Sequence, residues 1–358
     1  NTRYNGPSNN ESMSAVFLNI NRNKKSVCVD LKSKDGQLII NKLIKISDIF
    51  VSNIRKGALE RIGFTHTNFK KINPKIITAN AVGFSSKGPY AGLPAFDDTI
   101  QAISGMAAYQ EAYSNQPSYT SGATADKVTG LMLGMAIMGA LFQRNIKGVG
   151  CELEVPMMET MVDFTLAEHL YGYNFVPPKA PPIYPRQSSP NRRPYKTQDG
   201  YIAVLPYTDA QWVRFFKMIG KEDTLQDPQF ESLNARHENI NLLYSILSEE
   251  LENNKTNYWI KKLRENDIPA MEVNFPEDLF KDKHLKETNF FKVQDHPTEG
   301  KLMYTNFPVD FNFDSDNKSL HAPNLGEHTD EILCELGYSD IEIKKLVSEG
   351  VIKLFNQK

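Results

Sequence analysis

Cysteine is scarce in this chain of 358 residues. The three that occur, Cys28, Cys151 and Cys334, lie far apart and are odd in number. A disulfide framework needs an even set at regular spacing, so a disulfide-stapled secreted scaffold is excluded and a reducing, cytoplasmic compartment is favoured. CxxC and HExxH spacings are missing as well, and the histidines are scattered. We therefore expect no metal site.

An excess of charge of either sign is also missing. Lysine and arginine total 41, aspartate and glutamate total 43, and the net charge is −2. This balance gives no electrostatic reason to expect a nucleic-acid partner. Glycine-rich phosphate loops and the GxSxG elbow of hydrolases are absent, so neither a nucleotide-phosphate cradle nor that class of hydrolase is supported. No signal peptide is recognised, and we expect no membrane partner.

Short apolar runs alternate with amphipathic segments in the first part of the chain. The pattern predicts strands at 26–31, 47–53 and 75–84, with helices between them. Strand–helix alternation of this kind is typical of α/β proteins with a parallel sheet covered on both faces. Because such sheets bind ligands beyond the carboxyl ends of their strands, the loops at 53–57 and 83–92 are candidate binding segments.

A proline-rich stretch at 176–194 interrupts this pattern and indicates a domain boundary. Beyond it, one strand and several amphipathic helices predict a separate α+β unit. From about Asp295 the pattern changes again. The segment at 299–311 is typical of a β-hairpin, and a helical tail follows it.

A single carboxylate, Asp126, begins the apolar segment at 121–144. Taken alone, it is best interpreted as a helix cap, because aspartate is favoured at helix N-termini. The apolar run is too short for a membrane span, which predicts a core helix. Gly130, Gly134 and Gly139 reduce helix propensity, so we expect them to allow close approach of another backbone.

Two further clusters have alternative interpretations. Asp97 and Asp98 form either a pair of catalytic acids or, as we favour, an acid-rich helix N-terminus. Arg55, Lys56 and Arg61 follow a predicted strand end. They form either a solvated basic turn or an anion site for a phosphorylated ligand.

Four stretches together resemble the class III CoA-transferases, the family of formyl-CoA and carnitine CoA-transferases and the α-methylacyl-CoA racemases. They are INRNKKSVCVDLKSKDG, DIFVSNIRKGALERIGF, NPKIITANAVGFSSKGPYAGLPAFDDTIQAISG and APNLGEHTDEILCELGYSDIEI. The similarity covers essentially the whole chain, in order.

The resemblance implies a Rossmann-like large domain with a parallel sheet, built from both chain ends, and a smaller α+β domain between them. The corresponding boundaries are 1–185 for the first part of the large domain, 186–294 for the small domain and 295–358 for the returning segment. Members of this family form interlocked dimers, so the resemblance also implies a homodimer.

The resemblance assigns Asp126 the role of nucleophile, which reverses its interpretation as a cap. It implies that this carboxylate forms a mixed anhydride and then an aspartyl-CoA thioester, with coenzyme A as cosubstrate and small carboxylic acids as the other substrates. The CoA contacts that it implies are Lys32, Asn53, Ile54, Arg61 and Phe96.

The sequence departs from the family pattern in three places. The βαβ unit that carries an AGP turn ahead of a GDxTR stretch is not seen, although Thr2-Arg3 matches the end of that stretch. The glycine-rich lid has no counterpart, and Arg192 or Arg193 is the nearest candidate to recognise a substrate carboxylate. Phe96 replaces the histidine that racemases use as a base, and phenylalanine cannot accept a proton. We therefore expect a transferase, with a racemase-type epimerase and a non-catalytic CoA-binding protein as alternatives.

Overall fold

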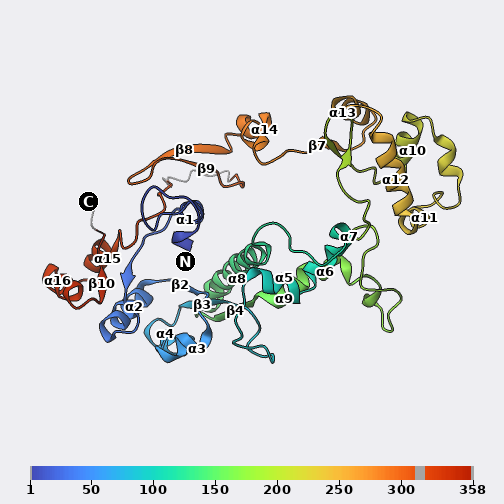
Figure 1. The fold of residues 1–358 in the computed structure, drawn as a ribbon. Helices are drawn as coiled ribbons and strands as arrows, with labels where there is room; N and C mark the ends of the chain where they lie inside the picture. Colours follow the sequence, from blue (N-terminus) through green and yellow to red (C-terminus); the bar gives the residue numbers. More distant parts are fainter. Residues whose placement is uncertain (1, 311–318, 356–358) are drawn as a thin grey trace. The chain divides into compact units, whose positions relative to one another are not determined.

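The structure, a computed structural model, describes residues 2–310 and 319–355. Figure 1 shows its helices and strands, coloured along the chain. The chain divides into two compact units. The first unit combines Asn1–Ala79, Met138–Leu153 and Pro276–Lys358, and the second combines Asn80–Ile137 and Glu154–Phe275. Both ends of the chain thus fall in the first unit. The division into domains at residues 185 and 294 stays a prediction.

Mixed α/β structure with a parallel sheet is present, as the alternating pattern predicts. The sheet has the order β2-β3-β4. Its strands are β2 (Ile49–Ser52), β3 (Ile77–Val82) and β4 (Glu152–Pro156), and the helices between the first two are α3 (Lys56–Arg61) and α4 (His66–Ile72). α2 (Lys34–Ile46) precedes β2 and begins at Ser33, whose hydroxyl accepts a hydrogen bond from the Gly36 N–H. This N-cap satisfies one of the free amides at the start of the helix.

The prediction that residues 26–31 join the parallel sheet is wrong. β1 (Cys28–Val29) pairs antiparallel with β10 (Ile352–Lys353). The reason is a hydrophobic cluster in which Val29 packs with the helices α15 (Thr329–Glu335) and α16 (Asp340–Ser348), represented by Leu333 and Leu346. A strand of two residues carries too little periodicity to show which partner it selects.

The expected hairpin is present, but it begins earlier than the sequence indicates. β8 (Phe291–His296) and β9 (Gly300–Thr305) pair antiparallel from Phe291↔Thr305 to His296↔Gly300. The same unit contains the short helices η1 (Thr2–Tyr4), α1 (Ala15–Ile20), η4 (Asp278–Phe280) and α14 (Lys283–Glu287). Arg3 donates to the Pro323 carbonyl (3.1 Å) and lies over the Phe17 ring (3.8 Å).

The second unit contains the beginning of the apolar helix. Its helices before the proline-rich stretch are α5 (Asp97–Ile103), α6 (Met106–Tyr109), α7 (Glu111–Ser114), α8 (Thr124–Lys147), which continues into the first unit, and α9 (Met157–His169), followed by η2 (Tyr171–Asn174). Ile100, Ala125 and Met161 bring α5, α8 and α9 into one buried cluster. The loop before α5 passes close to the backbone of Gly83. A Cβ added at Gly83 would lie 2.3 Å from the Ala95 Cβ.

A second core lies within the same unit, after the proline-rich stretch. β5 (Tyr195–Lys196), β6 (Tyr201–Val204) and β7 (Ala270–Glu272) form an antiparallel sheet in that order. Its hydrophobic cluster includes residues of α10 (Asp209–Met218), η3 (Glu222–Gln226), α12 (Ile240–Leu251) and α13 (Thr256–Glu265), and α11 (Leu233–Glu238) contacts α12. Trp212, Phe215, Phe216 and Trp259 are buried in this core. These helices and the antiparallel sheet give the segment the α+β character that the pattern predicts, while its separation as a domain stays a prediction.

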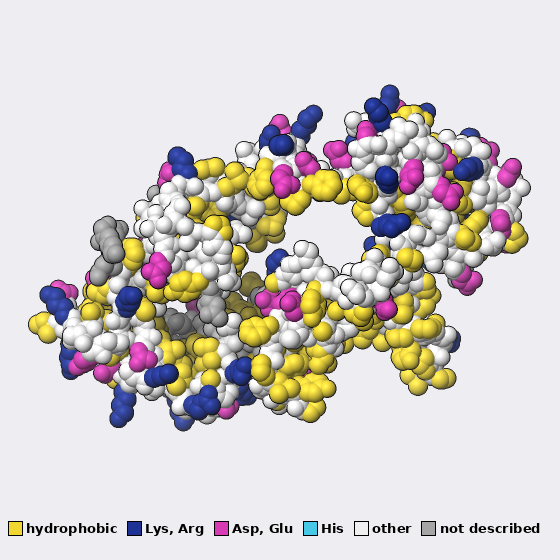
Figure 2. Space-filling model, in the orientation of Figure 1, with side chains coloured by type: hydrophobic (Ala, Val, Ile, Leu, Met, Phe, Trp, Pro, Cys, Tyr) yellow, Lys and Arg dark blue, Asp and Glu magenta, His cyan; other side chains and the backbone are white. Residues whose placement is uncertain are grey.

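The prediction of a buried α8 is wrong. Leu131, Met135, Met138, Phe142 and Ile146 are between 64% and 76% exposed. Their spacing of three or four residues places them along one stripe of the helix. By length and composition alone, and within the described residues, α8 is long and apolar enough to cross a membrane, so the expectation that this apolar run is too short for a membrane span is wrong. Only 17% of the most apolar part of the helix is buried. Hydrophobic side chains are also exposed over the proline-rich segment after α9 (Figure 2).

Candidate active site

Asp126 lies in the first turn of α8, but it is not the residue that caps the helix. The Lys127 N–H donates to the Ala123 carbonyl (3.2 Å), which makes Ala123 the first residue of the helical hydrogen-bond pattern. The Asp126 N–H is therefore one of the free amides of the first turn. It donates to Oδ1 of Asp97 at 2.9 Å. The carboxylate that caps α8 thus belongs to Asp97, and the interpretation of Asp126 as a cap is wrong.

Asp97 is held in turn by a buried amide. It is the first residue of α5, and Nε2 of Gln101, one turn later, donates to its Oδ2 at 2.6 Å. Gln101 is fully buried, and its Oε1 accepts from the Thr120 N–H (2.9 Å) and hydroxyl (3.1 Å). The Thr120 hydroxyl lies 2.7 Å from that of Thr124 at the start of α8. These bonds fix the start of α8 against α5.

The expected acid-rich helix N-terminus is confirmed, since Asp97 and Asp98 both lie in the first turn of α5. Sequence reasoning missed Gln101 and Thr120. The spacing of Asp97 and Gln101, four residues apart on one helix, is the signal that indicates a contact between them.

The Asp126 carboxylate is free and exposed. Within the described part of the chain, no hydrogen bond or ion pair holds it. Partial desolvation, and secondly the negative charge of Asp97, raise the pKa of Asp126. An unpartnered carboxylate with a raised pKa is a better nucleophile than one held in an ion pair. Because the group is exposed, this chain does not by itself exclude water from it.

Phe96 directly precedes Asp97 and also lies in the second unit. It is the N-cap residue of α5, and its N–H donates to the Thr99 hydroxyl (3.0 Å). Its side chain is 77% exposed. The ring therefore stands in solvent next to Asp97, where a bound molecule can cover it.

The other predicted CoA contacts lie in the first unit, on segments that share one hydrophobic cluster. Leu31, Phe50 and Leu59 belong to that cluster, next to the segments that carry the predicted contacts. Those contacts, all at least partly exposed, are Lys32, Asn53, Ile54 and Arg61. Exposed cations beside a strand end suit a phosphorylated ligand.

The backbone shapes these segments. The Lys32 N–H donates to Asp30 Oδ1 (3.0 Å), and the Ile54 N–H donates to the Ser52 hydroxyl (3.0 Å). The neighbouring Lys56 lies 4.0 Å from the Glu152 carboxylate. Lys32 and Arg61 have no such carboxylate partner among the described residues, which leaves both cations available to a ligand.

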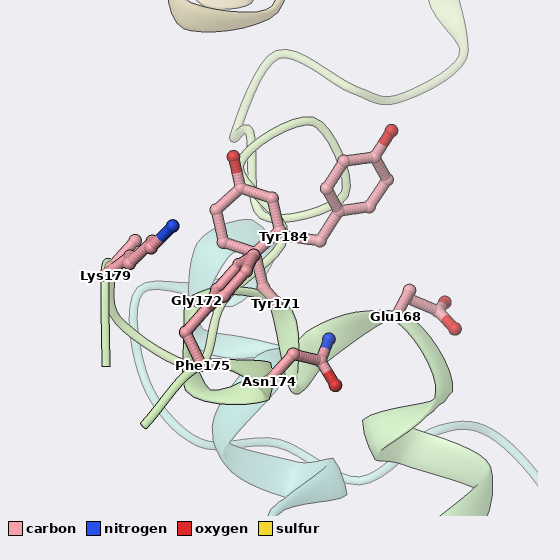
Figure 3. Close-up of a pocket in the computed structure, with 8 residues that line it drawn as sticks. Glu168, Tyr171, Gly172, Asn174, Phe175, Lys179 and Tyr184 are labelled. Carbon is pink, nitrogen blue, oxygen red and sulfur yellow. The ribbon is translucent and has the colours of Figure 1, made fainter. Parts of the chain in front are cut away.

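A cavity of about 460 Å³ lies at the end of α9, and it includes none of the predicted site residues. Figure 3 shows three aromatic side chains there, Tyr171, Phe175 and Tyr184, with Lys179 on one side and Glu168 on the other. Next to it, His169 stacks on Tyr109 with 3.9 Å between ring centroids and accepts a hydrogen bond from the Tyr184 N–H (3.2 Å). Burial lowers the pKa of His169. This histidine is structural, as expected.

Arg192, a candidate to recognise a substrate carboxylate, lies in the second unit. It donates to the Tyr113 hydroxyl (3.3 Å). Among the described residues, no group of three or more histidine, cysteine, aspartate or glutamate side chains is arranged to hold a metal ion.

Comparison with known proteins identifies the family. The family model described as CoA-transferase family III matches residues 1–329. The chain belongs to CoA-transferase family III. As a class III CoA-transferase, it is an enzyme, and the resemblance recognised in the sequence is confirmed.

Curated relatives of this class III CoA-transferase include three named transferases, each 28% identical to it. The human succinyl-CoA:glutarate CoA-transferase aligns with 98% of this chain and 80% of its own length. The (R)-2-hydroxy-4-methylpentanoate CoA-transferase of Clostridioides difficile aligns over 93% and 84%. The formyl-CoA:oxalate CoA-transferase of Rhodopseudomonas palustris aligns over 95% and 85%.

Solved structures show the same fold. A CAIB/BAIF family protein from Brucella suis superposes with a TM-score of 0.74 at 25% identity, over 94% of this chain and 88% of its own. A Mycobacterium tuberculosis protein, in an orthorhombic crystal form, gives a TM-score of 0.76 at 22% identity, over 88% and 85%.

Proposed function

We propose that this class III CoA-transferase moves coenzyme A from an acyl-CoA to a second carboxylic acid through covalent intermediates on Asp126. One observation carries the proposal: Asp126 stands at a helix N-terminus with its carboxylate unpartnered, because Asp97 accepts the hydrogen bond that a cap would take. A carboxylate in that position is free to react.

The first half-reaction forms the enzyme thioester. A carboxylate oxygen of Asp126 attacks the thioester carbonyl carbon of acyl-CoA, the C–S bond breaks, and coenzyme A leaves as a thiolate. The product is a mixed anhydride between Asp126 and the acyl group. The thiolate then attacks the Asp126 carbonyl carbon, the anhydride C–O bond breaks, and the first acid leaves as a carboxylate. An aspartyl-CoA thioester remains.

The second half-reaction repeats these steps in reverse. The acceptor carboxylate attacks the aspartyl thioester and expels the thiolate, which gives a second mixed anhydride. The thiolate attacks the acceptor's acyl carbon, which releases the new acyl-CoA and restores the Asp126 carboxylate. No net proton transfer is needed. Covalent catalysis thereby divides a difficult exchange of carboxylates into easier steps.

Coenzyme A is the cosubstrate in this proposal. Lys32 and Arg61 supply cations for its phosphates, and Asn53 with Ile54 supplies the loop for its nucleotide end. Phe96, the residue before Asp97, is a further contact for coenzyme A in this proposal. The acids that we propose are small carboxylic or dicarboxylic acids, in keeping with the glutarate and oxalate for which two relatives are named.

The exposed stripe of α8 supports a homodimer. Added Cβ atoms at Gly130, Gly134 and Gly139 would meet nothing within 4 Å in this chain. Small residues beside exposed large apolar ones suit the close approach of a second copy. Such a partner would also help to exclude water from the exposed Asp126, which a mixed anhydride requires.

Trapping the intermediate tests the proposed function. The enzyme is incubated with an acyl-CoA and hydroxylamine, which converts an activated carboxyl into a hydroxamate, and is then digested and analysed by mass spectrometry. We expect modification at Asp126 that depends on acyl-CoA, and Asp126→Asn is expected to lose transfer activity by about a thousandfold or more. Asp98→Asn is the matched control and is expected to retain both.

Two outcomes would contradict this function. Turnover with Asp126 unmodified would exclude it as the nucleophile. Exchange of the α-proton with solvent, without transfer of coenzyme A, would show that the protein is a racemase-type epimerase.

A further inference from the structure

We propose that Asp97 is the positioning residue of the active site: it caps α8 in place of Asp126 and holds the reactive carboxylate free of the helix. This inference rests on the proposed role of Asp126 as nucleophile. The geometry that carries it is the 2.9 Å hydrogen bond from the Asp126 N–H to Asp97 Oδ1.

The capping bond prevents a competing interaction. The first-turn amides of a helix attract any nearby carboxylate, and an aspartate in that turn commonly interacts with them. A carboxylate engaged in this way has its lone pairs occupied and is a poor nucleophile. Because Asp97 already accepts a hydrogen bond from the Asp126 N–H, that amide is not available to the Asp126 side chain itself.

Only an ionised carboxylate fits position 97. The Oε1 of Gln101 accepts two hydrogen bonds from Thr120, which fixes the orientation of its amide. The Gln101 NH₂ group must therefore face Asp97, where it donates to Oδ2. Asp97 thus meets a donor on each oxygen. An asparagine there would place its own NH₂ group against one of those donors, whichever way it turned.

Electrostatics adds a second effect. After desolvation, the charge of Asp97 is the next cause of the raised pKa of Asp126. A more basic carboxylate attacks a thioester faster when ionised. Of the other charges on adjoining elements, Asp98 is exposed, Lys127 lies beside Gly122, and Glu159 on α9 accepts from the Ser85 N–H (3.2 Å).

Three variants separate these effects. Asp97→Asn removes the charge and breaks the donor pattern. Asp98→Asn removes a charge one residue away that forms no bond to Asp126, and it is the matched control. Asp97→Asn combined with Gln101→Glu restores the pattern. In this double variant the new amide at position 97 accepts from the Asp126 N–H and donates to the new carboxylate at position 101, which still accepts from Thr120. The negative charge then lies one hydrogen bond further from Asp126.

The expected results differ in kcat, KM and pH profile. For Asp97→Asn we expect kcat to fall about a hundredfold, as a misplaced reacting group does, with KM for acyl-CoA little changed. The double variant is expected to recover much of this kcat. In both, the acidic limb of the pH profile of kcat is expected to shift to lower pH, because the neighbouring charge that raises the pKa of Asp126 is lost or moved away. Asp98→Asn is expected to match the wild type.

The hydroxylamine trap distinguishes failure of this inference from failure of the proposed function. If wild-type Asp126 is never labelled during turnover, the proposed function fails. If wild-type Asp126 is labelled and Asp97→Asn is labelled at the same rate, Asp97 does not position it. A rise in KM alone would show that Asp97 contacts the substrate instead. Should Asp97→Asn fold poorly, a folded double variant that labels Asp126 far more slowly than the wild type would equally overturn the inference, because the restored hydrogen-bond pattern would then not position the carboxylate.

Discussion

At the scale of single residues, two neighbouring carboxylates have different roles: one caps the helix α8, and the other is left free of that helix. Asp97 accepts the helix amide, and Asp126 keeps its oxygens free. The role of Asp126 as nucleophile is a prediction from the sequence around it, which resembles a family with a known nucleophile. The contact between Gln101 and Thr120 could not be predicted, since it depends on hydrogen bonds between residues 19 positions apart. Such contacts form only when the fold brings α5 to the start of α8.

The raised pKa of Asp126 predicts a pH-dependent stability. A carboxyl group whose pKa is higher in the folded state binds its proton more tightly there, so its ionisation destabilises the fold. This destabilisation is absent below the unfolded pKa and complete above the folded one. We expect Asp126→Asn to raise the melting temperature at about pH 7 and to equal the wild type near about pH 3. Thermal melts across pH provide the measurement.

The expected gain for Asp126→Asn is small, about 0.3 kcal/mol, because the carboxylate is only partly desolvated and solvent screens its repulsion from Asp97. Asp98→Asn serves as the control for loss of one charge. A variant less stable than the wild type at neutral pH would show that the Asp126 carboxylate supports the helix after all.

Arg61 allows a test of CoA recognition. It lies exposed at the end of α3, and we propose that it meets a CoA phosphate. We expect Arg61→Gln to raise KM for acyl-CoA about tenfold with kcat nearly unchanged, because a charge-assisted contact of about 1.4 kcal/mol is lost. The effect should shrink at high salt. Lys70→Gln, an exposed cation of α4, is the control, and equal effects of the two substitutions would indicate a general electrostatic contribution only.

At the scale of elements, sequence periodicity located most helices and strands, because amphipathic spacing is a local property. It failed where tertiary contacts decide. β1 has only two residues and joins β10 in place of the parallel sheet. α8 is apolar as predicted, yet its stripe is exposed, because periodicity reports which residues need burial and not which chain buries them.

The α8 stripe predicts a dimer that a single charge disrupts. Phe142, one of the five residues of the stripe, is 70% exposed. We expect the wild type to be a homodimer and Phe142→Glu to be monomeric at micromolar concentration, since an unpaired charge in an apolar interface is costly. Light scattering after size exclusion measures this. Ile341→Glu, on an exposed position of α16, is the control. A monomeric wild type, or binding of the stripe to lipid vesicles, would contradict the homodimer.

At the scale of the whole molecule, the chain contains several separate hydrophobic clusters, and its α/β character and second α+β core followed from the sequence pattern. The candidate nucleophile and the candidate phosphate contacts belong to different compact units. That they serve one reaction site is part of the proposed function. Local spacing carries no information about it, whereas family resemblance does.

The pairing of β1 with β10 has a consequence for substrate recognition. The Val351 carbonyl accepts from the Asp30 N–H (2.8 Å), and the Asp30 carboxylate accepts from the Lys32 N–H. The backbone at Lys32, which we propose as a contact of a CoA phosphate, is therefore linked through Asp30 to Val351. Truncating or tagging the chain close to Ile352 would weaken this connection to Lys32, hundreds of residues earlier in the sequence. We expect the altered protein to bind a CoA affinity resin more weakly.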